Sequence, residues 1–167
     1  MEKDKFFNPD YKPDENTRNE IENLHKEDIS LSGVQLQFAD MKNANLTNAD
    51  LSNSDLTRAD FSGASMYGVN LAGANLFKTN FEGANLKAAN MKNCNMLAAD
   101  FSNTKLNNVD WDEDYKVINE REAEKALSSG DVNTAKEKYR ESEDIYRALK
   151  ITLQKQSLGE DTGEMFL

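Results

Sequence analysis

The sequence predicts an all-β repeat solenoid of about four coils with α-helical caps at its N- and C-terminal ends. Three observations support this fold class. A five-residue pattern keeps its register from Ile29 to Glu113, which makes seventeen units. Within each unit a large apolar residue and a small residue two places earlier flank a polar one. On both sides of this region the apolar residues change to helical spacing. The chain therefore divides into an N-terminal cap with a short helix (1–28), a repeat region (29–113) and a C-terminal helical segment (114–167).

The N-terminal cap is predicted to contain its short helix just before the first repeat. Asp14 or Asn16 is placed to cap the start of this helix. Ile21 and Leu24 are three residues apart and would lie on one helix face, over the open end of the first coil. His25 lies among charged neighbours, so we interpret it as a surface residue rather than a ligand.

The composition of the repeat unit explains how a solenoid would form. The central residue is Leu in nine of the seventeen units, and the residue before it is Asp or Asn in thirteen. Residues two apart on an extended chain point to the same side, so the apolar and small residues face inward and the Asp or Asn faces water. The last position is Gly or Asn in eleven units, as a type II turn with φ > 0 requires. Four such corners close a coil of 20 residues, and successive coils stack through backbone hydrogen bonds.

Units such as ADLSN, ANLFK and ADFSG resemble the A(D/N)LXX consensus of the pentapeptide-repeat family. The resemblance covers 85 of the 167 residues and implies the fold of that family, a right-handed quadrilateral β-helix. It implies no single function, because known relatives include quinolone-resistance proteins that mimic DNA and bind gyrase as well as cyanobacterial regulators. The segment EDIYRALKITLQKQSLGEDTGEMFL resembles the helical YRxLK segment that follows pentapeptide repeats in some archaeal and bacterial proteins.

The interior of the repeat region is predicted to be filled by its own side chains. Phe61, Phe81 and Phe101 recur at a spacing of 20 residues, so their rings should stack on one another. Cys94 occupies a small-residue position and should be a buried, unreactive thiol. A filled coil leaves no slot for a substrate or cofactor, and we predict no catalytic, cofactor-binding or metal-binding residues.

The second corner of each coil departs from the pattern. Its corner residues are Phe38, Arg58, Lys78 and Ala98, with neither Gly nor Asn, which predicts a different turn type there. The candidate partner surface on this side, called the stripe below, consists of Phe38, Arg58, Phe77, Lys78 and Leu97. Its apolar members point outward, which is typical of an interaction site. Either a partner binds this stripe or the terminal helices of the chain cover it.

The C-terminal segment is predicted to form two helices. The first spans 114–128 and ends at Ser128-Ser129-Gly130, and Asp131 caps the second. A candidate helix seam with steps of three and four follows on the second helix: Val132, Ala135, Tyr139, Tyr146, Leu149 and Leu153. This seam fits a helical hairpin or a coiled-coil homodimer. The apolar end Met165-Phe166-Leu167 indicates that the chain is truncated there or that its last residues dock on something.

Charge and composition exclude several classes of function. The 20 Lys and Arg against 30 Asp and Glu give a net charge of −10, which disfavours binding to nucleic acid and to anionic lipid. One cysteine and one histidine exclude a disulfide framework and a Cys/His zinc site. No apolar run approaches the roughly 20 residues that span a bilayer, and we expect a cytoplasmic protein.

These features together predict a non-enzymatic scaffold that mediates protein–protein interaction through a solenoid face and its terminal helices. Its protein partner is unknown. One alternative is a DNA mimic that binds gyrase, but residues 29–110 hold seven acids and six bases, a net of −1, which is a poor substitute for phosphates. Another alternative is a soluble accessory domain of a larger, possibly membrane-associated protein.

Overall fold

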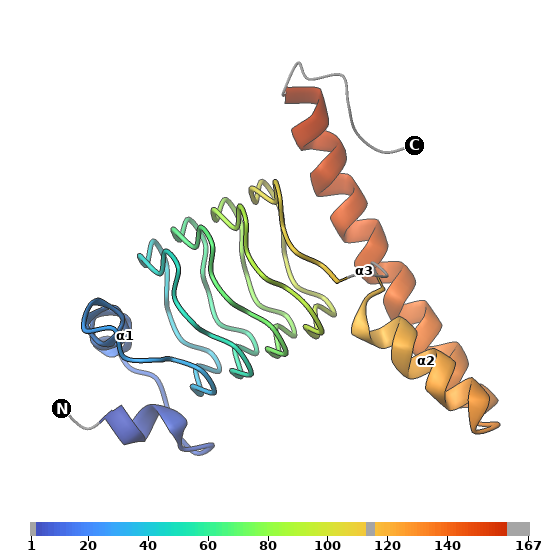
Figure 1. Ribbon diagram of the computed structural model, residues 1–167, viewed down its shortest axis with the longest axis horizontal. Coiled ribbons are helices and arrows are strands. Elements are labelled where there is room, and N and C mark those ends of the chain that lie inside the picture. Colours follow the sequence, from blue (N-terminus) through green and yellow to red (C-terminus); the bar gives the residue numbers. More distant parts are fainter. Residues whose placement is uncertain (1–2, 113–115, 160–167) are drawn as a thin grey trace.

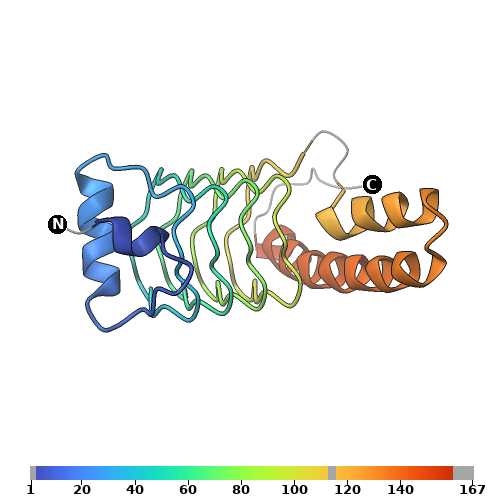
Figure 2. The same cartoon turned by 90° about the horizontal axis from the view of Figure 1, so that it is seen from below.

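The computed structural model describes residues 3–112 and 116–159. A 3-10 helix, η1 (Lys3–Phe7), and α1 (Thr17–Lys26) precede the repeat region, and α2 (Ile118–Ser128) and α3 (Val132–Gly159) follow it. The repeat region forms a stack of coils, with η1 and α1 at one end and the α2–α3 pair at the other (Figures 1 and 2). The predicted docking of Met165, Phe166 and Leu167 concerns residues outside these ranges.

The repeat region is a solenoid with 20 residues per coil. Twelve isolated parallel bridges join residues 20 apart in the described chain, from Gln35 with Asp55 to Asn90 with Asp110. Each bridge involves a single residue, and the described residues contain no longer strand. The β character of the solenoid is therefore limited to one paired residue per unit, because a turn follows two residues later.

Backbone hydrogen bonds fix the register between coils. The N–H of Leu36 donates to the carbonyl of Asp55 (2.8 Å), and the N–H of Asp55 donates back to the carbonyl of Val34 (3.0 Å). The N–H of Ala39 then donates to the carbonyl of Leu36 (3.0 Å), which closes the turn between two faces. Repetition of this pattern satisfies most backbone groups inside the solenoid.

All corners of the solenoid have the same left-handed backbone. Every corner residue from Gly33 to Asn108 has a positive φ, including Phe38 (65°), Arg58 (57°), Lys78 (57°) and Ala98 (58°). The predicted different turn type at the second corner is therefore wrong. The reason is that the same hydrogen bond closes the turn at all four second corners: the N–H of Ala39 donates to the carbonyl of Leu36 around Phe38 (3.0 Å), and that of Ala99 donates to the carbonyl of Met96 around Ala98 (3.0 Å). This turn gives each corner a positive φ, at a cost on the order of 1–3 kcal/mol for a residue other than Gly.

The interior of the coils is filled as the sequence predicts. Phe61 and Phe81 stack with ring centroids 5.7 Å apart, and Phe81 and Phe101 stack at 5.6 Å. The predicted ring ladder is confirmed. Where the small inward residue is polar, it donates to a carbonyl of the preceding coil, as from Thr104 Oγ1 to the carbonyl of Phe81 (2.7 Å). This bond satisfies the buried hydroxyl.

Helix α1 closes the N-terminal end of the solenoid. Ile21 and Leu24 are fully buried, as expected for a helix that lies over the first coil. Three polar side chains of α1 bond the unpaired backbone of that coil: Arg18 Nη1 donates to Lys42 O (3.0 Å), His25 Nε2 bonds Thr47 O (2.9 Å), and Glu22 Oε1 accepts from Asn45 N (2.6 Å). The interpretation of His25 as a plain surface residue is wrong, because its half-buried ring is part of this cap.

Helices α2 and α3 form a hairpin at the other end. α2 begins at Ile118 rather than near residue 114 and ends at Ser128, and Gly130 has a φ of +84°. Asp131 Oδ1 accepts from the N–H of Thr134 (3.1 Å), so the predicted cap of the second helix is confirmed. The two helices pack against each other through small residues, among them the buried Ala123 and Ala135.

Candidate partner-binding surface

The stripe lies along the second corner of the solenoid, where each coil contributes residues at the same two turn positions. Phe38 is 66% exposed, and Arg58 and Lys78 are also exposed. Phe77 and Leu97 are half-buried. The solenoid therefore brings all five residues to one side, but only the part from Phe38 to Lys78 is open to solvent to a large extent.

Both basic residues of the stripe lie over aromatic rings. The guanidinium carbon of Arg58 is 5.6 Å from the ring centroid of Phe38, and Lys78 Nζ is 5.2 Å from that of Phe77. A cation within about 6 Å of a ring face is attracted by its quadrupole. The two contacts order side chains that would otherwise be free to move in solvent, so the stripe presents alternating aromatic and cationic groups.

Acidic residues beside the stripe are bonded within the solenoid. Asp60 accepts from the N–H of Ser62 (2.9 Å) and from Asn80 Nδ2 (3.2 Å), and it pairs with Lys42 (3.4 Å). Burial acts to raise the pKa of Asp60, but the hydrogen bonds from Ser62 and the charge of Lys42 outweigh it and hold the pKa below its usual value. This carboxylate is therefore ionised and already partnered at neutral pH.

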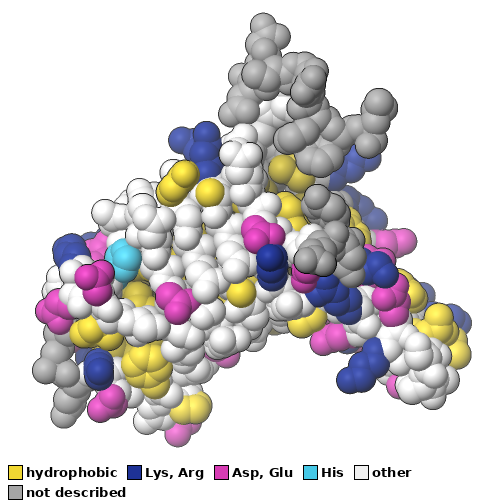
Figure 3. Space-filling view, viewed as in Figure 1, with side chains coloured by type: hydrophobic (Ala, Val, Ile, Leu, Met, Phe, Trp, Pro, Cys, Tyr) yellow, Lys and Arg dark blue, Asp and Glu magenta, His cyan; other side chains and the backbone are white. Residues whose placement is uncertain are grey.

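Charge is unevenly distributed over the molecule. On the face in Figure 3, acidic and basic side chains gather over the η1–α1 end and over the α2–α3 hairpin, and much of the solenoid between them is uncharged. This view agrees with the net charge of −1 counted over residues 29–110, seven acids against six bases. The negative charge of the protein lies mainly at its ends.

The hairpin reaches only the Leu97 end of the stripe. Leu97 lines a small cavity of about 130 Å³ together with Ile118, Asn119 and Glu122 of α2 and Lys138 of α3. Phe38, at the opposite end, is too exposed to lie under a helix. The terminal helices thus cover only the Leu97 end of the stripe, and the Phe38 end is open to a partner.

The helix seam is divided by the structure. Ala135 and Leu149 are buried, and Leu153 packs in part against the solenoid core. Val132 is 49% exposed, and Tyr139 and Tyr146 remain partly exposed. The face that α3 buries also contains three residues outside the predicted seam, namely Ser142, Ile145 and Thr152. The seam is therefore a mixture of hairpin contacts and open surface.

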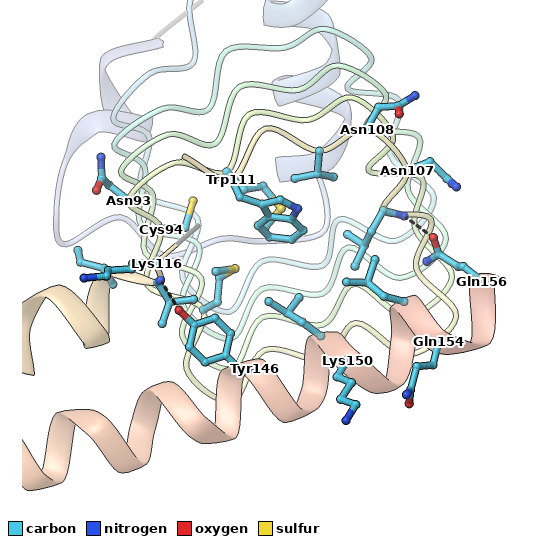
Figure 4. Close-up of a pocket in the computed structure, with 18 of the residues that line it drawn as sticks. Asn93, Cys94, Asn107, Asn108, Trp111, Lys116, Tyr146, Lys150, Gln154 and Gln156 are labelled. Carbon is cyan, nitrogen blue, oxygen red and sulfur yellow. Dashed lines mark hydrogen bonds between the residues drawn. The ribbon is translucent and has the colours of Figure 1, made fainter. Parts of the chain in front are cut away.

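A cavity of about 870 Å³ lies where the last coil meets α3, a feature that sequence reasoning missed. Trp111 and Cys94 line it from the coil, and Tyr146 and Gln156 line it from α3, whereas Lys150 and Gln154 point away (Figure 4). The expectation of a molecule without a cavity is wrong at this point. Side chains fill the coils themselves, but a helix crossing an open end covers it unevenly.

Two residues of α3 replace the contacts of a further coil. Thr152 Oγ1 donates to the carbonyl of Phe101 (3.0 Å). Gln156 Nε2 donates to the carbonyl of Thr104, and Gln156 Oε1 accepts from the N–H of Leu106 (3.2 Å). The sequence contains no signal for these roles, because Thr and Gln on a helix are typical of solvent-exposed positions.

The chemistry needed for catalysis is not assembled around Cys94. Its thiol is buried and donates to the carbonyl of Leu71 (2.9 Å). Burial raises the pKa of Cys94 to about 12, so the thiolate nucleophile does not form at neutral pH. Across residues 3–112 and 116–159, no group of three or more His, Cys, Asp or Glu side chains could hold a metal ion.

Comparison with known proteins identifies the repeat. The family model described as pentapeptide repeats matches eight copies, over residues 29–68, 54–93 and 70–108. The repeat region of this chain belongs to the pentapeptide-repeat family. The resemblance found from the sequence is thereby confirmed. Among curated proteins no match was found.

Solved pentapeptide-repeat structures resemble parts of this chain. HetL, involved in heterocyst differentiation regulation in the cyanobacterium Nostoc sp. strain PCC 7120, is 32% identical over 49% of this chain and 36% of its own, with a TM-score of 0.38. A second protein from the same cyanobacterium is 26% identical over 54% of this chain and 73% of its own (TM-score 0.33). Rfr23 from Cyanothece 51142 is 32% identical over 52% and 65% (TM-score 0.27). This chain, with its pentapeptide-repeat region, thus aligns with about a third of HetL.

Within the described residues, no helix flanking the pentapeptide repeats combines the length and the apolar character needed to cross a bilayer.

Proposed function

We propose that this protein is a non-enzymatic scaffold whose stripe binds a protein partner. The observation that supports this most directly is Phe38, a phenylalanine that is 66% exposed and lies beside the guanidinium of Arg58. Aromatic residues and arginine are enriched at the energetic centres of protein interfaces. Pentapeptide-repeat proteins are generally structural or interaction proteins, which agrees with this role.

The rigidity of the solenoid favours binding at this site. The stripe residues lie at corners where a closing turn bond and a bond to the next coil hold the backbone, as at Arg58, whose N–H donates to the carbonyl of Phe77 (2.9 Å). A surface that is already ordered loses less conformational entropy when it binds.

We also propose the detailed fold of the repeat region and the cellular location of the protein. The coils form the right-handed quadrilateral β-helix of the family, with about four coils, since corners recur every five residues and bridges every 20. A cytoplasmic location fits the single free and buried thiol, Cys94, because a reducing compartment has no need of disulfides.

The proposal is tested by affinity capture from extracts of the source organism, with the full chain immobilised. Wild-type protein should retain a specific protein, and Phe38→Asp should reduce its recovery by about tenfold, because a carboxylate replaces the apolar anchor beside Arg58. Circular dichroism should be unchanged, since the Phe38 side chain is mostly in solvent.

Tyr67→Asp provides the matched control. Tyr67 is another aromatic residue at a corner of the solenoid, is 49% exposed and lies outside the stripe. This variant should retain the partner at the wild-type level. Equal recovery by all three proteins, or equal loss in both variants, would contradict binding through the stripe.

A further inference from the structure

Within the described part of the chain, the basic residues of the stripe have no acidic partner. None of the ion pairs in residues 3–112 and 116–159 includes Arg58 or Lys78. Both cations lie over rings instead, which leaves their N–H donors directed to solvent or to an incoming group. In a protein of net charge −10, this corner of the solenoid thus presents two exposed cations in one row.

Two carboxylates on the faces beside this corner, Asp55 and Asp60, are already bonded within the solenoid. Asp55 accepts from Gln37 Nε2 (3.0 Å) through one oxygen and from the N–H of Thr57 (3.0 Å) through the other. Asp60 is bonded to Ser62, Asn80 and Lys42. A rotation of either carboxylate toward the stripe would break the turn bond that it accepts, at a cost of about 1 kcal/mol or more for each bond.

We propose that the stripe recognises an acidic protein segment whose carboxylates bind Arg58 and Lys78 and whose apolar side chains pack on Phe38 and Phe77. This inference rests on the proposed function and names the chemistry of the partner. Arg58 and Lys78 occupy the same corner of successive coils, and their backbones are therefore about 4.8 Å apart. Two residues three or four apart on a helix have Cβ atoms about 5–6 Å apart, which is close to this backbone spacing.

Arrangement along the coil axis adds specificity. Phe38 lies one coil before Arg58, and Phe77 lies in the same turn as Lys78, so each cation lies over one aromatic ring. A segment with only charge would leave these rings in water, and a segment with only apolar groups would leave the cations without a partner. The surface therefore selects for a pair of carboxylates flanked by apolar residues.

Direct binding of a defined probe tests the inference. The probe is a fluorescent helical peptide with two Glu residues four positions apart, flanked by Leu residues, and its counterpart has Gln in place of both Glu. Fluorescence anisotropy with the full chain should show about tenfold tighter binding of the Glu peptide, and the preference should fall as salt is raised. In the double variant Arg58→Gln with Lys78→Gln the preference should disappear.

Lys87→Gln with Lys105→Gln is the matched control, because it removes two cations from a different corner and face of the solenoid. It should retain the preference for the Glu peptide. Equal affinity for both peptides, loss of the preference in the control, or tighter binding of an oligonucleotide of equal charge would overturn the inference. If Phe38→Asp abolishes capture while the Glu peptide shows no preference, the proposed function stands and only the acidic partner is refuted.

Discussion

Five corners of the solenoid hold a residue other than Gly or Asn in the left-handed conformation: Phe38, Arg58, Lys78, Ala88 and Ala98. For an L-residue this backbone is costly, because Cβ crowds the carbonyl group. Asn and Gly at the other corners relieve this cost. Three of the five belong to the stripe, so the strained corners coincide with the candidate binding surface, as is common for residues kept for function.

At Ala88 the left-handed corner is held by a backbone bond from its N–H to the carbonyl of Asn107 (2.9 Å), which glycine would keep while relieving the strain. Ala88 has a φ of 57° and an exposed side chain. We expect Ala88→Gly to raise the free energy of unfolding by about 0.5–1 kcal/mol, since removal of Cβ gains more in the folded state than the extra freedom of the unfolded chain loses. Urea denaturation measures the change.

Ala72→Gly is the control for this prediction. Ala72 lies in a solenoid turn next to a corner glycine and is not among the residues with positive φ. Glycine there brings only the entropic penalty and should lower the free energy of unfolding by about 0.5–1 kcal/mol. A loss of stability in Ala88→Gly of the same size would show that the corner is not strained.

In the caps, side chains make the hydrogen bonds that backbone groups make inside the solenoid. Within the coils, the backbone of Lys105 makes two such bonds: its carbonyl accepts from the N–H of Leu86 (3.0 Å), and its N–H donates to the carbonyl of Ala84 (2.9 Å). One coil later the side-chain amide of Gln156 makes both bonds. An amide side chain has the same donor and acceptor as a peptide group, so a helix can end the solenoid without leaving these groups unpaired.

Loss of this amide should weaken the C-terminal cap. We expect Gln156→Leu, which keeps a similar size, to lower the free energy of unfolding by about 1–3 kcal/mol, because the N–H of Leu106 and the carbonyl of Thr104 lose their partner. Hydrogen exchange at the Leu106 amide should become faster in this variant, which distinguishes a cap defect from a general loss of packing.

Gln154→Leu serves as the comparison on the same helix. Gln154 is exposed, so its replacement should change the free energy of unfolding by less than about 0.5 kcal/mol and leave the Leu106 amide protected. If both variants behave alike, the amide of Gln156 does not act as a substitute for a coil.

At the scale of the whole molecule, part of the helix seam is exposed, so the predicted homodimer remains a prediction that can be tested. Val132, Tyr139 and Tyr146 are seven residues apart on α3 and all partly exposed. A homodimer through these residues would give a molar mass of about twice 18.8 kDa by light scattering at high concentration. Tyr139→Glu with Val132→Glu should then lower the mass, since charges would be buried without partners.

Arg140→Glu with Lys136→Glu gives the control, because these two exposed residues of α3 lie outside the seam. It should leave the association unchanged. A molar mass that stays at that of one chain over a hundredfold range of concentration would refute the homodimer, and the hairpin would then be the only assembly that the seam supports.

The repeat itself could be predicted from the sequence. The choice of Leu31, Met41 or Phe61 for the interior, the spacing of the Phe ladder and the coil of 20 residues all follow from a pattern that neighbouring units repeat, so each position is described many times over. Local chemistry and geometry are then sufficient, because each coil contacts only its neighbours. The members of the stripe could be named for the same reason.

Contacts between unlike elements were decided only by the tertiary structure. His25 caps one end of the solenoid and Gln156 caps the other, and neither contact is repeated along the chain. Helical periodicity does not indicate which polar residue of a helix will contact an open coil. The seam was assigned by spacing alone, whereas the position of α3 over the last coil buries Ile145 and Thr152 and leaves Tyr139 partly exposed. The repeating solenoid and most of its corners follow from the sequence alone, since the same five-residue pattern and the same local turn recur in every coil. Tertiary packing decided the caps and the cavity, because these depend on hydrogen bonds and contacts between segments that no local pattern relates.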